Sequence, residues 1–403
     1  MTIKERVIKI TAEACRLLIG VVFIFSGFVK AVDPMGGAIK IEDYLSSFGL
    51  DFLKPFSVIL SFNLSALEFT LGLCILLGVY RRFTSILIFI FMVVMTPLTL
   101  YLAIFNPVSD CGCFGDAVVI SNWETFFKNV LLLIASIVLL IYNQRLLQVY
   151  TYKAFWFIFF FSYIYSLVFC WYNYTHLPVI DFRPYKVGAN ITDLMTVPED
   201  AEEDEYLFTF IYEKNGVQKE FSLDNYPAND TSWTFIAAET KLIKEGFRPE
   251  VDDFHIYNRK DDDVSRELLS HPGPLILVIA PRLEKASDER IDEINNVYDY
   301  CVDHNIPFYC VTASNDDAIR RWTDYTGAEY EYLIADETLL KTIIRANPGM
   351  VLLREGTILK KWNYKDIPQE EDIESVINSY LNDKENEIGK QHRSLRTNLL
   401  SFT

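Results

Sequence analysis

The sequence predicts an α-helical membrane bundle followed by a water-soluble α/β domain. Three observations indicate this fold class. The N-terminal part contains five apolar runs of about 20 residues, the length that a helix needs to cross a bilayer. The charge then changes sharply, because residues 1–172 carry a net +2 and residues 173–403 carry −19, which together make the −17 of the whole chain. The C-terminal part alternates apolar strand patterns with amphipathic helix patterns.

Basic residues mark one side of the five predicted spans. The spans cover approximately 14–33, 56–80, 83–105, 125–142 and 154–172. The flanking basic residues lie before the first span, between the second and third, and between the fourth and fifth: Lys4, Arg6, Lys9, Arg81, Arg82, Arg145 and Lys153. Because the positive-inside rule places such residues in the cytoplasm, we expect a cytoplasmic N-terminus. The loops at about 34–55 and 106–124, and the C-terminal domain, are then expected outside.

The loop after the third span holds Cys111 and Cys113, separated by a single glycine. Cysteines at i and i+2 in a turn can reach the Cα separation of roughly 4.4–6.8 Å that a disulfide requires. The small ring would be strained and easily reduced, which suits exchange, and the outer side of the membrane permits disulfides. We expect the neighbouring carboxylates, Asp110 and Asp116, to raise the thiol pKa and slow attack.

Three interpretations of this cysteine pair stay open. The first is redox exchange, with Cys111 and Cys113 as catalytic residues and a membrane quinone as a candidate electron acceptor. The second is a structural role, which includes a bridge from one of the two to Cys170 near the outer end of the fifth span. The third is a soft-ligand metal site that His176 and Cys170 are near enough in sequence to complete. We take redox exchange as the prediction, with no metal.

A carboxylate, Glu68, lies inside the second predicted span. Near the bilayer centre an unpaired charge costs at least about a few kcal/mol, so we expect Glu68 to face the bundle interior. Its candidate partners are Asn129, Lys30 and Arg16, although the two basic residues are also expected to extend toward opposite membrane interfaces. Glu68 is either a hydrogen-bonded contact between helices or a site that handles a proton or a ligand.

A linker and a small β-rich region are expected at 173–248. The expected strands are 206–212, 217–223 and 233–238. An Asn-Gly pair between the first two strands is typical of a type I′ hairpin turn.

In the region 249–382 a short extended run and a short helix come first, and the order strand, helix, strand, helix, hairpin, helix follows. The expected elements are 253–257, 264–269, 274–280, 287–304, 307–311, 316–326, 349–353 with 358–362, and 367–381. This order resembles a thioredoxin-like fold, and Pro348 stands where that fold carries its cis-proline. A polar tail, 383–403, follows.

The resemblance departs from redox-active thioredoxins at one place. No cysteine follows the strand 274–280, so the domain lacks a CxxC pair, and Cys301 and Cys310 fall instead on a helix and in a strand. We therefore expect this outer domain to bind a partner, or to present one to the bundle, rather than to perform thioredoxin chemistry.

The membrane part resembles the DoxX-like superfamily, and in particular its methylamine-utilisation accessory branch, MauE. The stretches that carry the likeness are RLLIGVVFIFSGFVKAVDP, LEFTLGLCILLG and DCGCFGD. The resemblance covers roughly 10–145 and implies a four-helix bundle at 1–145, here extended by a fifth helix at 146–172. It also implies a loose link to redox or disulfide maturation at the periplasmic face of the bacterial inner membrane. The whole chain resembles fusions to a thioredoxin-like outer domain of the kind found in Bacteroidetes-type bacteria.

Composition narrows the classes of function. The strong acidity argues against a nucleic-acid partner, because phosphate binding needs the opposite field. The predicted function is thiol-disulfide or quinone-linked redox maturation. The alternative is a non-enzymatic envelope scaffold that recruits another envelope protein. Transport through Glu68 ranks third, because the bundle lacks an internal repeat and paired broken helices.

Overall fold

A computed structural model gives the arrangement of the chain. It describes residues 2–108, 111–198, 201–202, 204–214, 216–222, 225–227, 232–244, 246–369, 372, 374–375 and 377–379. Asp110, the turn residue Asn215, much of the expected closing helix and the polar tail lie outside the described residues.

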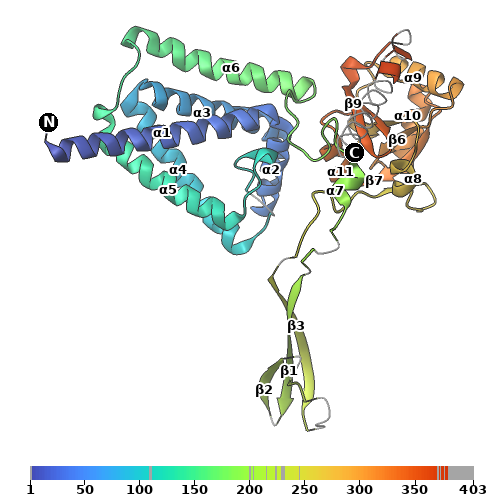
Figure 1. Cartoon of the computed structure of the whole chain (residues 1–403), viewed down its shortest axis with the longest axis horizontal. Helices are drawn as coiled ribbons and strands as arrows, with labels where there is room; N and C mark the ends of the chain where they lie inside the picture. Colours follow the sequence, from blue (N-terminus) through green and yellow to red (C-terminus); the bar gives the residue numbers. More distant parts are fainter. Residues whose placement is uncertain are drawn as a thin grey trace, which may run out of the picture.

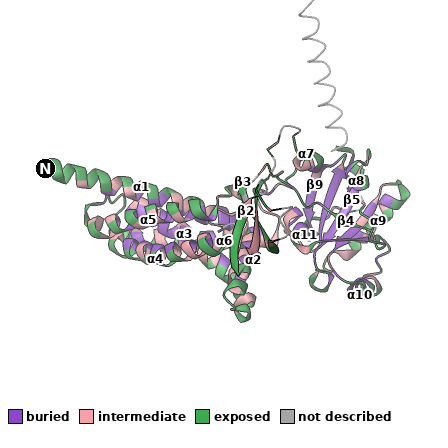
Figure 2. Ribbon diagram, turned by 90° about the horizontal axis from the view of Figure 1, so that it is seen from below, coloured by how far each residue is buried: buried purple, intermediate pink, exposed green. Residues whose placement is uncertain are grey.

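Five long helices form the N-terminal bundle (Figure 1). They are α1 (Ile3–Val32), α3 (Ser57–Leu77), α4 (Arg81–Phe105), α5 (Asn122–Tyr142) and α6 (Phe155–Thr175). Each is long and apolar enough to cross a membrane, which confirms the five predicted spans in length and composition. The inward faces of α1, α3, α4 and α5 share one apolar core, and the first turns of α6 pack in a separate cluster with Cys74 and Val79. Many large apolar residues of the bundle are exposed, as expected of helices that lipid surrounds (Figure 2).

A helix that the sequence did not predict, α2 (Pro34–Ser47), follows α1 directly. Asp33 caps it by accepting a hydrogen bond from the backbone N–H of Gly36 at 2.9 Å. We expected only a loop at about 34–55 and missed this helix, because two adjacent glycines weaken the helical pattern. In the fold these glycines serve packing, since a Cβ at Gly37 would lie 2.5 Å from the hydroxyl of Ser61 on α3. A 3₁₀ turn, η1 (Asp51–Phe56), then leads into α3.

One end of the bundle faces the soluble part of the chain. α1, α4 and α6 end there, α3 and α5 begin there, and α2 lies across it (Figure 1). We call it the domain-facing end, and the opposite end the far end. The loop between α4 and α5 belongs to the domain-facing end.

A six-stranded mixed sheet forms the C-terminal α/β domain. Its strand order is β4-β7-β6-β5-β8-β9. The strands are β4 (Ile256–Tyr257), β5 (Leu275–Ala280), β6 (Phe308–Thr312), β7 (Glu331–Ala335), β8 (Gly349–Arg354) and β9 (Thr357–Asn363). β5, β6 and β7 run parallel, and β8 pairs antiparallel with β5 and β9. Every residue of β5 is buried, as its continuous apolar pattern predicted (Figure 2).

Among the described residues, this sheet is accompanied by the helices α8 (Ser265–Leu269), α9 (Ile291–Asp303), α10 (Asp316–Thr326) and α11 (Glu337–Ile343). The sequence analysis missed β7 and α11, whose sequences EYLIA and ETLLKTI each carry only a short apolar run between polar residues. The bond between Asn347 and Pro348 is cis, as expected from the place of Pro348 before β8. Assignment to the thioredoxin-like class stays a prediction.

A separate three-stranded antiparallel sheet projects from the α/β domain (Figure 1). Its strands are β1 (Glu205–Lys214), β2 (Val217–Ser222) and β3 (Thr234–Lys244), in the order β2-β1-β3. A short helix, α7 (Ile191–Met195), precedes it. Aromatic rings pack on one another here, with Phe221 between Tyr212 and Trp233.

Candidate functional site

Cys111 and Cys113 lie side by side in the loop between α4 and α5. Their Sγ atoms are 3.0 Å apart, and both residues are buried against Leu102 at the end of α4. Gly112 turns the chain between them with φ +62°, a conformation that favours glycine. The loop therefore brings the two thiols into direct contact, as the spacing predicted.

Two hydroxyl groups fix the loop through its backbone. Tyr44 of α2 donates a hydrogen bond to the carbonyl of Cys111. Ser26 Oγ on α1 lies 2.7 Å from the carbonyl oxygen of Cys113 and 2.7 Å from Glu68 Oε2. Because a hydroxyl carries one hydrogen, Ser26 donates to only one of these two oxygens at a time.

Glu68 forms a buried ion pair with Lys30. The Lys30 ammonium lies 2.7 Å from both carboxylate oxygens and 3.1 Å from Ser26 Oγ. The structure pairs Lys30 with Glu68, and whether Lys30 also reaches a membrane interface stays a prediction. The Ser26 hydroxyl therefore lies between Glu68 and the backbone of Cys113 and donates to one of them at a time.

The other two candidate partners of Glu68 are occupied elsewhere. Arg16 lies at the far end, where it pairs with Glu13 and donates to the carbonyl of Leu76 at 2.7 Å. Asn129 donates to the hydroxyl of Thr99 at 3.2 Å. Sequence reasoning listed the correct partner but had no means of choosing it.

A cavity of about 30 Å³ lies inside the bundle next to Cys113. Polar groups of Ser26, Lys30, Glu68 and Lys128 line it together with apolar side chains. Its size corresponds to about one water molecule. It therefore suits a proton or a water molecule and is too small for a solute.

The two thiols differ in pKa. A hydrogen bond from Cys111 lowers the pKa of Cys113 to about 6, and the Lys128 and Lys30 ammonium groups act in the same direction against burial. The same hydrogen bond, together with burial, raises the pKa of Cys111. Cys113 is therefore the thiolate at neutral pH and Cys111 the proton donor beside it.

The carboxylate of Asp116, expected to hinder this ionisation, faces the α/β domain. It lies 3.6 Å from Arg345, and burial and the nearby Asp33 raise its pKa. Asp110 lies outside the described residues.

The remaining cysteines are separate from the pair. All seven cysteines are free thiols, so the bridge to Cys170 that we considered is not formed. Cys170 is buried in α6. Cys301 in α9 and Cys310 in β6 are buried in the α/β core, where burial raises the pKa of both. After β5 the chain forms the turn η5 (Leu283–Lys285), which carries no cysteine.

The metal interpretation finds no ligand set in the described part of the chain. Within those residues, no three His, Cys, Asp or Glu side chains are grouped to hold an ion. His176 instead stacks on Tyr172.

A cleft of about 1080 Å³ separates the bundle from the α/β domain. Gly112, Gly115 and Asp116 of the cysteine loop form part of its bundle wall, together with residues of α2. The linker after α6 and helix α11 form the opposite wall. The cysteine loop thus has the small cavity on one side and the cleft on the other.

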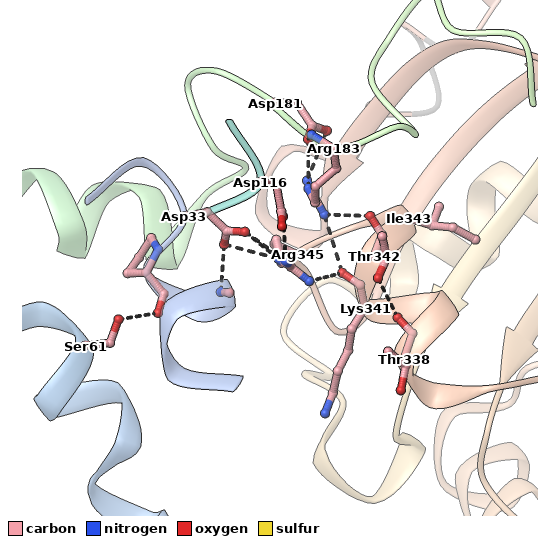
Figure 3. Close-up of polar contacts among 12 residues, drawn as sticks. Asp33, Ser61, Asp116, Asp181, Arg183, Thr338, Lys341, Thr342, Ile343 and Arg345 are labelled. Atoms are coloured by element: carbon pink, nitrogen blue, oxygen red, sulfur yellow. Dashed lines mark hydrogen bonds and ion pairs between the residues drawn. The ribbon is translucent and has the colours of Figure 1, made fainter. Parts of the chain in front are cut away.

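Arg345 joins the two walls (Figure 3). Its guanidinium contacts both carboxylate oxygens of Asp33. Nη2 of Arg345 lies 2.8 Å and Nε 3.0 Å from Oδ2 of Asp33, and Nε also lies 3.1 Å from Oδ1. Burial raises the pKa of Asp33, but the Arg345 charge outweighs it and holds that pKa below its ordinary value. We call the contacts of Arg345 with Asp33 and Asp116 the Arg345 clasp.

A second buried ion group ties the linker to the α/β domain. Asp181 pairs with Arg183 and with Lys361 of β9, at 2.8 and 2.9 Å. Arg183 also donates to the carbonyl of Thr342 at 2.9 Å (Figure 3). Burial and the charge of Arg183 lower the pKa of Lys361 to about 8, although Asp181 opposes them.

Sequence reasoning missed Ser26, Asp33 and Arg345. Asp33 before Pro34 is a helix-capping signal that was available, since Asp is a favoured N-cap and Pro a favoured first helical residue. The partner of Asp33 was not available, because Arg345 is 312 positions away and in another domain.

Comparisons with known proteins fit this division of the chain. Residues 8–142 match the model of the family described as methylamine utilisation protein MauE. Residues 206–245, which hold most of the projecting sheet, match a domain of unknown function, DUF8463. Neither the comparison with curated proteins nor that with solved structures found a match. The MauE match spans α1 to α5 and includes the cysteine loop, so the membrane part of the chain, with its apolar helices, is similar to this family.

Proposed function

We propose that this protein catalyses thiol-disulfide exchange through Cys111 and Cys113 at the periplasmic face of the bacterial inner membrane. One observation carries the proposal: two buried thiols lie 3.0 Å apart in a turn. Formation of a bond of about 2.05 Å needs a movement of only about 1 Å. The unequal thiol pKa values give one sulfur the role of nucleophile and the other that of resolving thiol.

The exchange consists of two successive displacement reactions at disulfide bonds, in which one bond forms for each bond that breaks. The Cys113 thiolate attacks a partner disulfide, which forms a mixed disulfide and releases one partner thiolate. Cys111 then attacks Cys113 Sγ, which forms the Cys111–Cys113 disulfide and releases the second partner thiolate. In the reverse direction a partner dithiol is oxidised, and the reduced pair returns two electrons and two protons to a membrane quinone.

Charge distribution supports the orientation. Arg81 and Arg82, between α3 and α4, and Arg145, after α5, lie at the far end of the bundle. By the positive-inside rule the far end is cytoplasmic, so the cysteine loop and the α/β domain lie in the periplasm.

Single replacements of the cysteines test the proposal. At pH 7, Cys113→Ser should slow the reaction with an aromatic disulfide reagent at least tenfold, because the remaining Cys111 thiol is protonated. Cys111→Ser should keep a reactive thiol but stop at the mixed disulfide, which thiol-trapping gels detect. Cys170→Ser, also a buried thiol, is the matched control and should behave as wild type. Unchanged rates in both loop variants, with normal protein accumulation, would reject the exchange.

The pH profile provides an independent test. Alkylation of the reduced wild-type protein should rise with pH and reach half of its maximum near pH 6, because the thiolate of Cys113 is the reacting form. Mass spectrometry of the alkylated loop at several pH values measures this directly. A midpoint near 9 would show that Cys113 is an ordinary thiol.

A non-enzymatic scaffold is the second candidate. It is favoured by the turn after β5, which carries no cysteine and gives the α/β domain no relay of its own. In that case the domain recruits another envelope protein and the bundle anchors it. The third candidate, a transporter, has little support, because Glu68 is paired with Lys30 and the adjoining cavity measures only about 30 Å³.

A further inference from the structure

We propose that the cleft between the bundle and the α/β domain binds an extended, cysteine-containing segment of a partner polypeptide and places it against the cysteine loop. The inference rests on the proposed exchange function and names its substrate class. In this arrangement the α/β domain forms one wall of the substrate-binding cleft.

The size and chemistry of the cleft favour a polypeptide. Sites for small organic ligands measure about 300–1,000 Å³ and are mostly apolar. This cleft is slightly larger, at about 1080 Å³, and charged side chains of both signs line it. They include Lys40, Glu42, Asp43, Lys186, Glu250, Asp336 and Lys341. Such a lining matches the amides and mixed side chains of a peptide better than a quinone ring, which needs an apolar pocket.

The cleft leads to the reactive pair. Gly112 lies on its wall, and the two buried thiols flank this residue in the chain. A side chain at this position would both strain the turn, at φ +62°, and meet the Lys40 side chain at 3.2 Å. A small rotation of the loop about Gly112 and Gly115, which also has positive φ, turns a sulfur toward the cleft.

Buried ion pairs among the residues that line the cleft hold its two walls together. The Arg345 clasp fixes α2 and the cysteine loop to the α/β domain, and Arg183 fixes the linker to the end of α11. These buried charges set the spacing of the walls before any ligand arrives, which reduces the entropic cost of binding.

The reaction in the cleft needs no further reagent for one turnover. A substrate thiolate attacks one sulfur of the Cys111–Cys113 disulfide, and the other sulfur leaves as a thiolate. A second substrate thiolate then attacks the mixed disulfide. The substrate gains a disulfide, the cysteine pair gains two electrons, and the two substrate protons pass to the pair or to water.

Val119 and Val118 offer a matched pair of variants. Both are exposed valines of the cysteine loop, with 72% and 43% of their surface accessible, and only Val119 lines the cleft. Val119→Trp narrows the cleft, whereas Val118→Trp adds the same bulk beside it. Thr338→Trp, at an exposed position of α11 on the opposite wall, narrows the cleft from the α/β domain.

Single-turnover oxidation with two probes decides the question. The purified full-length protein, with its cysteine pair oxidised, is mixed either with reduced, unfolded ribonuclease A or with dithiothreitol. Val119→Trp and Thr338→Trp should slow oxidation of the polypeptide at least tenfold and leave dithiothreitol oxidation within twofold of wild type. Val118→Trp should leave both rates unchanged.

Three outcomes would count against the inference. If the cleft variants oxidise the polypeptide at the wild-type rate, or lose both activities equally, the cleft is not its binding site. If wild type oxidises dithiothreitol but not the polypeptide, the substrate class is wrong while the exchange function stands. If wild type oxidises neither probe, the exchange function itself is rejected.

Discussion

Lys30 lines both the cleft and the small cavity next to Cys113. Lys30 therefore lies between the cleft side of the cysteine loop and the interior of the bundle. Glu68 neutralises Lys30 and shares the Ser26 hydroxyl with the carbonyl of Cys113. The buried ion pair thus lies next to the backbone of Cys113, with the Ser26 hydroxyl between them.

Removal of one partner of this ion pair should destabilise the bundle. Glu68→Gln leaves the buried Lys30 charge without its counterion, at an expected cost of about 3–5 kcal/mol in the free energy of unfolding. Glu68→Leu combined with Lys30→Met should recover most of that loss, because two apolar side chains replace both charges. Thermal unfolding in detergent micelles measures the difference.

Asp51→Asn is the control for this prediction. Its pair with Lys54 is exposed, so the change should cost about 1 kcal/mol or less. Equal destabilisation by the two single variants would show that the pair of Lys30 and Glu68 has no special part in holding the helices together.

At the scale of elements, the Arg345 clasp holds the start of α2 against the segment that follows α11. Asp33 ends α1, caps α2 and accepts Arg345, so one carboxylate sets the direction of two helices and the position of a domain. The pattern of the sequence predicted the helices and strands whose period or apolar run is long, such as α10 and β5. It failed for α2, β7 and α11, whose form depends on partners distant in the chain. The same limit applied to the site, where the thiol pair was predictable from spacing and Arg345 was not.

Arg345→Ala should release the α/β domain from the bundle. We expect faster hydrogen–deuterium exchange in the first turn of α2 and in the linker at 178–183, because both lose the contact that fixes them. Arg320→Ala, which removes an exposed pair with Asp317 on α10, is the matched control and should change neither segment. Unchanged exchange in Arg345→Ala would mean that the cleft walls are held by other contacts.

Strong acidification should release the contact between Asp33 and Arg345. The folded pKa of Asp33 lies below its unfolded value, so the stabilisation is complete above the ordinary pKa of an aspartate, about 3.9. It is lost as the pH falls through the depressed folded pKa. Hydrogen exchange of α2 at pH 7 and at pH 5 should therefore agree after correction for intrinsic rates.

At the scale of the whole molecule, the projecting sheet is an insertion whose two ends meet. The backbone N–H of Val251 donates to the carbonyl of Leu194 at 3.3 Å, and Phe247 donates to Glu202 at 2.8 Å. Residues between these points form their own strands and match a separate family model. The chain thus leaves the α/β domain and returns to it at almost the same place.

Replacement of residues 199–248 by two glycines should therefore leave the rest of the molecule folded. We expect unchanged hydrogen exchange in β5 and in α1, and an unchanged rate of dithiothreitol oxidation. The measurement is made on full-length and shortened protein in the same detergent. Loss of protection in β5 would show that the sheet supports the α/β core.

The linker between Thr175 and Asn190 also tethers the α/β domain to the bundle. A short tether holds two binding surfaces at an effective concentration on the order of millimolar. At that concentration an interface worth about 4 kcal/mol is already half formed. The Arg345 clasp and the few contacts around it are sufficient for docking on this scale, although they would be too weak to join two separate proteins. The tether therefore keeps the two surfaces of the clasp beside each other, so that a broken contact between Asp33 and Arg345 re-forms within the same chain.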